Sequence, residues 1–197
     1  MNTKNNQRSK LTKKLLKEAY LQLLHSSKNN KITVKNICEI AEVNRSTFYI
    51  YYNEPNDILI ELEESMIKET LDYLNQIKEK RKDHLSAQEG ILSFLAYIKK
   101  NQEMLYSLLI DNKDPMFQKK FKMISLDAIE NSFPVILKAK EYKVTYSFIA
   151  NGALGIIEEW IESECSTSKS QICDVLYKLS KSCLDSISIN KTKSKTM

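Results

Sequence analysis

The chain has 197 residues, of which 42% are hydrophobic and 28% charged, and it contains only three Gly and three Pro. A β-rich protein needs turn residues every 8–12 positions or so, so this composition argues against a sheet protein and predicts long helices joined by short loops. No apolar stretch approaches the roughly 18–20 residues of a membrane span, and the basic segment 1–17 lacks the apolar centre of a secretion signal. We therefore expect an all-α, cytoplasmic protein without a membrane partner.

Charge is spread unevenly along the chain, whose net charge is +5. Residues 1–53 hold ten Lys and Arg and three Glu, a net charge of +7, whereas the remaining residues sum to −2. A basic front on a slightly acidic body indicates a polyanionic partner for that front. A merely solvated basic face is the equal alternative on charge alone.

The first three predicted helices lie in this basic segment, at about 9–26, 34–41 and 45–51. An amphipathic stripe marks the first helix: Leu16, Ala19, Tyr20, Leu23 and Leu24. The second stripe is Val34, Ile37, Cys38 and Ala41. Thr33 and Asn44 stand where N-caps of the second and third helices are expected.

The rest of the chain predicts further helices, about nine in total. They fall at about 58–80, following Pro55 in a first-turn position, then 85–99 and 101–110, then from Pro115 until Pro134 interrupts the element, and finally at 144–161 and from 172 onward. We expect an N-terminal helical unit at 1–53, a larger helical body at 54–189, and a disordered basic tail at 190–197.

Two short helices joined by a three-residue turn after a longer helix form the helix-turn-helix layout. Its second helix enters the major groove, so the side chains near the start of that helix must be polar, while Phe48 seats it on the core. Arg45 can donate two hydrogen bonds to guanine, and Thr33 and Lys35 can bind a phosphate at the start of the second helix. The expected DNA-binding residues are Thr33, Lys35, Asn44, Arg45, Ser46, Thr47, Tyr49, Ile50 and Tyr51.

The segment from Ile32 to Cys38, together with Asn44-Arg45-Ser46-Thr47-Phe48-Tyr49 and Tyr51-Tyr52, resembles the DNA-binding domain of the TetR family over about residues 10–60. The stretches 94–98 and 152–160 are similar to a Firmicutes-type branch that includes regulators linked to dihydroxyacetone kinase. The resemblance implies a helix-turn-helix DNA-binding domain at 1–53 and a helical regulatory and dimerisation domain at 54–189. It also implies a homodimer through the last two helices, at about 143–163 and 169–187. It also implies a ligand-responsive repressor that binds a pseudo-palindromic operator in double-stranded DNA.

Three positions depart from the family pattern. Glu42 stands in the turn where Gly is usual, so a side chain must be accommodated there. Ile50 replaces a common His or Arg; it suits a thymine methyl group, or it faces away from DNA. Pro55 stands where a Lys often caps the fourth helix, which removes one phosphate contact from the expected set.

An effector, if there is one, would need a cavity in the second half, and aromatic side chains are the candidate lining. We expect a small-molecule pocket bordered by some of Phe94, Tyr97, Tyr106, Phe121, Phe148 and Trp160, with the other aromatics in the core. Gly152 and Gly155 interrupt a strongly apolar helix, where each costs up to about 1 kcal/mol relative to Ala, so we expect close approach of another helix.

Metal and catalytic sites are not expected. The four cysteines form no CxxC pair and lie far in sequence from His25 and His84, so they are expected to be free thiols, with Cys38 in the core, and no cofactor is expected. Three glycines cannot supply a Gly-rich phosphate loop, and no nucleophile–base pair stands out, so we expect no enzyme. A protein-binding co-regulator of the same fold is the alternative to a DNA-binding regulator.

Overall fold

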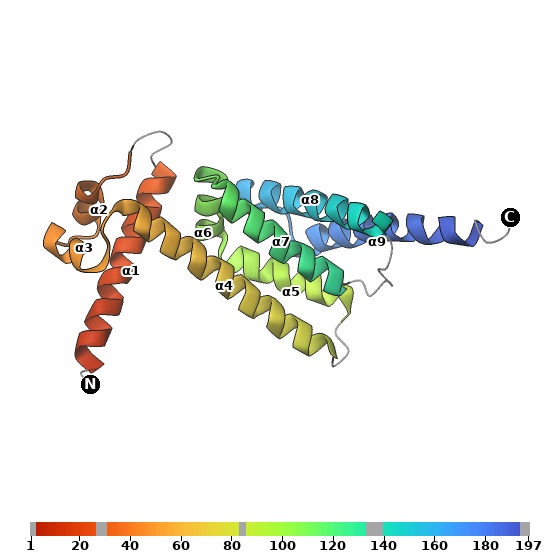
Figure 1. Cartoon of the computed structure of the whole chain (residues 1–197), viewed down its shortest axis with the longest axis horizontal. Helices are drawn as coiled ribbons and strands as arrows, with labels where there is room; N and C mark the ends of the chain where they lie inside the picture. Colours follow the sequence, from red (N-terminus) through yellow and green to blue (C-terminus); the bar gives the residue numbers. More distant parts are fainter. Residues whose placement is uncertain (1–2, 27–30, 83–85, 133–139, 194–197) are drawn as a thin grey trace.

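The computed structural model describes residues 3–26, 31–82, 86–132 and 140–193, and within these ranges it contains helices and no β-strand (Figure 1). The all-α prediction is confirmed. The N-terminal unit consists of α1 (Thr3–Ser26), α2 (Val34–Ile40) and α3 (Arg45–Tyr51), and the long helix α4 (Pro55–Lys82) follows. The body contains α5 (Ala87–Lys100), α6 (Gln102–Tyr106), the π-helical segment η1 (Ser107–Asp111), α7 (Pro115–Ser132), α8 (Lys140–Glu162) and α9 (Lys169–Lys193).

The helices α1–α3 form one end of an elongated molecule, and α4 runs from that end along the body (Figure 1). α4 packs against α1 at its start and against α5 and α7 further along. Within the body, α5 packs on α9, α7 on α8, and α8 on α9. α4 is therefore the element that joins the N-terminal unit to the rest of the chain.

The N-terminal unit folds around the apolar stripes that the sequence shows. From α1 and α2, Leu16 and Ile37 are fully buried, and Phe48 from α3 is fully buried beside them in the same hydrophobic cluster. Ile58 and Leu62 of α4 complete this core. The prediction that Phe48 packs α3 against the core is confirmed.

Local hydrogen bonds explain where the helices begin. The Thr33 hydroxyl oxygen accepts from the Asn36 N–H at 3.3 Å, which confirms Thr33 as the N-cap of α2. Asn44 occupies the N-cap position of α3, but its side chain makes no capping hydrogen bond. Asp114 Oδ1 accepts from two backbone N–H groups, those of Met116 and Phe117, at 2.8 Å each, immediately ahead of the α7 helix that Pro115 opens.

Two predicted boundaries are wrong. The single helix expected at 101–110 is instead α6 followed by η1, where the Asn112 N–H donates to the Ser107 carbonyl at 2.9 Å. The wider turn of η1 contains three consecutive buried residues, Ser107, Leu108 and Leu109. The tail expected to be disordered from 190 is helical as far as Lys193, because nothing between 184 and 193 is Gly or Pro; residues 194–197 lie outside the described ranges.

The turn between α2 and α3 contains a strained residue. Glu42 has φ of 53°, in the left-handed region, and this is the position at which the sequence lacks the usual Gly. A residue with a Cβ atom pays roughly 1–2 kcal/mol in that conformation. Glu42 therefore adopts a conformation that Gly would adopt more readily, at a cost in stability.

We expect Glu42→Gly to stabilise the protein by up to about 1 kcal/mol, because relief of the left-handed strain exceeds the extra backbone entropy that Gly brings to the unfolded chain. Chemical denaturation of both proteins measures the difference. Glu42→Ala is the matched control, since it removes the carboxylate and keeps the Cβ atom. An equal gain in the Ala variant would show that charge, and not backbone strain, is responsible.

Candidate nucleic-acid interface

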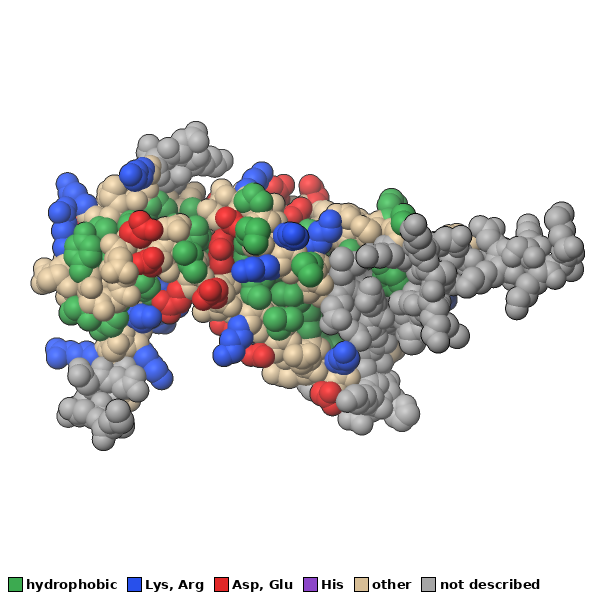
Figure 2. Space-filling model, in the orientation of Figure 1, with side chains coloured by type: hydrophobic (Ala, Val, Ile, Leu, Met, Phe, Trp, Pro, Cys, Tyr) green, Lys and Arg blue, Asp and Glu red, His purple; other side chains and the backbone are tan. Residues whose placement is uncertain are grey.

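The face of α3 that points to solvent is polar at its start and apolar further along. Asn44, Arg45 and Ser46 are exposed, and so are Tyr49 (58%) and Ile50 (72%). Thr47 and Tyr51 are half-buried beside Phe48. The orientation of the helix is therefore fixed by its buried side while its outer residues are available to a ligand, and Figure 2 shows Lys and Arg side chains around this end of the molecule.

The start of α2 adds two exposed residues to this surface, Thr33 and Lys35. Lys35 Nζ lies 3.8 Å from the Glu39 carboxylate, and both side chains are more than half exposed. An exposed pair of this kind is worth little, about 0–1 kcal/mol, so it does not hold Lys35 away from another anion. The Cys38 thiol lies just behind, and burial raises its pKa despite the charge of Arg45.

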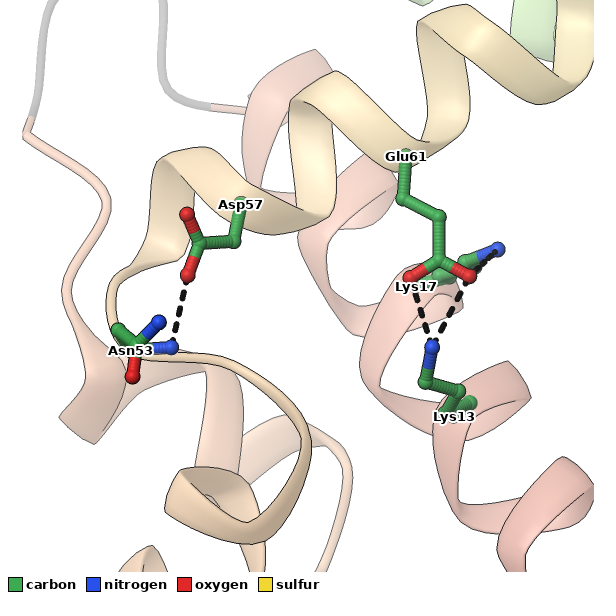
Figure 3. A network of polar contacts seen from close by, with 5 residues as sticks. All are labelled: Lys13, Lys17, Asn53, Asp57 and Glu61. Atoms are coloured by element: carbon green, nitrogen blue, oxygen red, sulfur yellow. Dashed lines mark hydrogen bonds and ion pairs between the residues drawn. The ribbon is translucent and has the colours of Figure 1, made fainter.

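The beginning of α4 satisfies its own backbone donors. Asp57 Oδ2 accepts from the N–H of Asn53 at 2.7 Å and from the N–H of Glu54 at 3.2 Å (Figure 3). These N–H donors and the helix dipole favour a negative charge at the start of α4, and the Asp57 carboxylate provides that charge. The start of α4 therefore has Pro55 in place of a Lys, and its free N–H groups bind the chain's own carboxylate.

Glu61 of α4 connects this helix to α1. Its carboxylate lies between Lys13 Nζ, at 3.0 and 3.1 Å from its two oxygens, and Lys17 Nζ, at 3.1 Å (Figure 3). All three side chains are about one quarter to two fifths exposed. We call these three residues the Glu61 clamp.

The Glu61 clamp keeps its carboxylate ionised. Burial raises the pKa of Glu61, but the hydrogen bonds from Lys13 and Lys17 and the charge of Lys17 outweigh burial and lower the pKa to about 2. Lys13 Nζ also lies 5.2 Å from the centroid of the ring of Tyr52, the residue that follows α3. The Tyr52 hydroxyl is buried, and burial together with the neighbouring Glu61 raises its pKa.

A second polar contact joins the N-terminal unit to the body. His25 Nδ1, in the last turn of α1, lies 3.0 Å from Asp111 Oδ2 at the end of η1. The His25 ring also meets the Tyr106 ring edge to face, with centroids 5.3 Å apart. α1 is therefore held at two places, by Glu61 of α4 and by the α6–η1 segment.

Comparison with known proteins agrees with this architecture. Residues 85–182 match the TetR-type family described as "Transcriptional regulator C-terminal region". A curated relative from Lactococcus lactis, named as the HTH-type dhaKLM operon transcriptional activator DhaS, is 26% identical over 142 residues, covering 72% of this chain and 69% of the relative.

The chain belongs to the TetR family of transcriptional regulators.

Solved structures of other TetR-type regulators share the fold. The dihydroxyacetone kinase operon activator DhaS has a TM-score of 0.58 at 20% identity, with 90% of this chain and 97% of that chain covered. A TetR regulator from Streptococcus agalactiae 2603V has a TM-score of 0.59 at 20% identity, with 89% and 94% covered. The predicted helix-turn-helix and helical body of a TetR-type protein are thus confirmed.

The aromatic residues expected to supply the border of an effector pocket differ in burial and in their neighbours. Phe121 is fully buried in the core, whereas Phe148 is 68% exposed on α8. Tyr106 is half-buried against His25, as described above. These three residues therefore differ in how far they are exposed.

Two of the other three aromatics, Tyr97 and Trp160, border different hollows. Tyr97 borders a hollow between α4 and α5, and the half-buried Phe94 stacks near it, with the ring centroids 6.2 Å apart. Trp160 is buried and borders a hollow of about 500 Å³ beside Gly152 and Gly155. Its ring N–H donates to the Thr167 carbonyl at 2.8 Å and is therefore used within the chain.

The glycines of α8 do not approach another helix of the same chain. A Cβ atom added at Gly152 or Gly155 would meet no atom within 4 Å. The expectation of close helix packing at these positions is therefore wrong for the single chain as described, and their cost to the helix is not offset there.

The four cysteines are free thiols, and no group of three metal-binding side chains occurs among the described residues. None of the described helices is long and apolar enough to span a bilayer.

Sequence reasoning missed the Glu61 clamp and the His25–Asp111 contact. Lys13 and Lys17 share a helix face, which is visible in the sequence, but their partner lies more than 40 residues away. His25 and Asp111 are separated by 86 residues. Because no periodic pattern links positions so distant, only the fold brings these residues together.

We expect Glu61→Gln to destabilise the protein by about 1 kcal/mol at neutral pH, after allowing for solvent screening of partly exposed charges. Since the folded-state pKa lies below the usual value for Glu, this stability is present above about pH 4.5 and is lost as the pH falls towards 2. Denaturation of both proteins across that range should show the difference closing. Glu64→Gln, an exposed carboxylate three residues further along α4, is the matched control; a constant difference at all pH values would contradict the role of the Glu61 clamp.

Proposed function

We propose that this regulator binds a pseudo-palindromic DNA operator as a homodimer, with α3 of each subunit in a major groove. The observation that carries the proposal is the arrangement of α3: Phe48 is fully buried and holds the helix, while Asn44, Arg45 and Ser46 are exposed at its start. A helix held in this way presents its first turn to base edges, as helix-turn-helix proteins require.

Different residues serve different contacts in this proposal. Arg45 reads a guanine through two hydrogen bonds, and Ser46 and Thr47 donate to or accept from neighbouring bases or phosphates. Ile50, being 72% exposed, is available to a thymine methyl group. The remaining proposed contacts are to phosphates: Thr33, Lys35, Asn44, Tyr49 and Tyr51.

Dimerisation through α8 and α9 is supported by the side chains that these helices leave exposed. Val144 (71%) and Phe148 (68%) lie at a helical spacing of four with Gly152, and Gly155 continues the same face of α8. On α9, Val175 and Leu179 are 45% and 55% exposed. A second copy covering these faces would bury the apolar side chains and would give the two glycines the close helix contact that the single chain lacks.

An effector would act by shifting the population of conformations. α4 touches both the N-terminal unit and the body, so a ligand that prefers one position of α4 changes the spacing of the two reading helices. Coupling of this kind is typically about 1–3 kcal/mol. The sign of regulation follows from where the operator lies, since binding over a promoter represses and binding upstream of it can recruit the polymerase. The resemblance seen in the sequence implies a repressor, whereas the curated relative is named as an activator.

A gel-shift assay with genomic fragments at low salt tests the proposal. We expect a shift at low protein concentration that yields a two-fold symmetric site. Absence of any shift, together with a stable complex with another protein, would favour the protein-binding co-regulator instead.

We expect Arg45→Ala to weaken binding to the selected site by about 1–3 kcal/mol and to relax the base preference at one position of each half-site. The paired variant Lys35→Ala should weaken binding to all sequences alike and reduce the slope of affinity against salt. Fluorescence anisotropy on selected and random DNA measures both. Equal losses on random DNA for Arg45→Ala would assign Arg45 to a phosphate rather than to a base.

We expect Gly152→Met to leave the folding of the single chain intact, because a Cβ atom there meets nothing within 4 Å, but to weaken the dimer. Overpacking of a close contact costs about 1–3 kcal/mol, which is roughly 5- to 150-fold in the dimer dissociation constant. Sedimentation velocity measures it, with Gly152→Ala as the small matched control. A dimer as tight as the wild type in the Met variant would contradict this interface.

A further inference from the structure

A hollow of about 430 Å³ lies between α4 and α5, away from α3. α4 contributes Glu69, Asp72, Tyr73 and Gln76, and α5 contributes Ala96 and Tyr97. Lys100 and Asn101 stand at the end of α5 on its border. The hollow is large enough for a small organic molecule, and its walls belong to two different helices.

Two tyrosine rings form the apolar wall of this hollow. The rings of Tyr73 and Tyr97 are stacked with centroids 4.7 Å apart and planes at 22°. Their hydroxyl groups are already used: Tyr73 donates to the Ser93 carbonyl at 2.9 Å, and the Tyr97 hydroxyl lies 3.0 Å from the Thr70 hydroxyl. Because both rings are fixed at their polar ends, they offer ring surface rather than hydrogen bonds to a ligand.

The charged groups around the rings favour a cation. Glu69 and Asp72 are exposed on α4, with Lys100 as the opposing charge, so the lining carries one net negative charge. Glu69 is close enough to contribute, after burial, to the raised pKa of Tyr97. No group of three metal-binding side chains occurs among the described residues, so a bare metal ion would lack ligands here.

We propose that this hollow binds a small organic cation, such as a methylated or otherwise alkylated ammonium, with its alkyl groups against Tyr73 and its charge beside Glu69 and Asp72. The face of an aromatic ring attracts a cation that lies within about 6 Å of the ring centre, and weakly hydrated quaternary ammonium groups are the ligands that this attraction suits best. The carboxylates add charge complementarity without demanding a fixed coordination geometry.

Binding here has a mechanical consequence, which rests on the proposed function. A ligand between α4 and α5 fixes the position of α4 against the body. On the same helix, the Glu61 clamp lies about two turns from Glu69, on the side of α3. The cation is therefore assigned as an effector that changes DNA affinity through α4.

Choline is the probe, and 3,3-dimethyl-1-butanol, which has the same shape without the charge, is its matched control. Saturation-transfer difference NMR on the full-length protein should show saturable binding of choline and at least about threefold weaker binding of the neutral isostere. Absence of a saturable choline signal, or equal binding of the two compounds, would overturn the proposal.

Variants locate the binding. Asp72→Asn and Tyr73→Leu should each weaken choline binding about threefold or more, Tyr73→Phe should retain it, and Lys100→Gln should strengthen it. Glu64→Gln, exposed on α4 outside the hollow, is the control. If choline binds but these variants leave its affinity unchanged, the site lies elsewhere and the proposal fails.

DNA affinity measured in parallel by gel shift separates the two proposals. If the protein binds DNA but does not bind choline at the hollow, only the assignment of this site is contradicted. If it binds choline there but binds no DNA, the proposed function is contradicted and the hollow remains a ligand site. Choline binding that leaves DNA affinity unchanged overturns the assignment of the cation as an effector.

Discussion

The arrangement of this protein depends on how the start of α4 is attached to α1. Ile58 and Leu62 of α4 are buried in the N-terminal core, and the ion pairs of Glu61 with Lys13 and Lys17 lie beside them. The same core seats α3 through Phe48, so the exposed turn of α3 has a defined position relative to α4. Since α4 also packs on α5 and α7, it connects α3 to the body.

The body holds the other end of this connection. His25 reaches Asp111 at the end of η1, so the same helix α1 is attached to the body by a second, partly exposed contact. The hollow between α4 and α5 lies on the body side of the Glu61 clamp. In the proposed dimer, a ligand in the hollow and the His25–Asp111 contact would both act on the angle between the N-terminal unit and the body. That angle would set the distance between the two copies of α3.

Local features were predictable from the sequence, and distant pairings were not. The stripe of Leu16, Ala19 and Tyr20, the Thr33 cap and the α3 bounds follow from periodicity and capping chemistry, and the strain at Glu42 follows from the missing Gly. The Glu61 clamp depends on residues that only folding brings together. The surroundings of each aromatic residue could not be predicted, because hydrophobic character does not say what a ring will face after folding: Phe121 is in the core and Phe148 is exposed.

We propose that two copies of α3 bind one operator. Selection of binding sequences from random DNA, followed by hydroxyl-radical footprinting of the selected fragment, tests this arrangement. We expect an inverted repeat whose two protected half-sites lie on one face of the duplex, with centres about one helical turn, roughly 34–36 Å, or a multiple of it apart. Failure to enrich any sequence, or a single protected segment without two-fold symmetry, would contradict it.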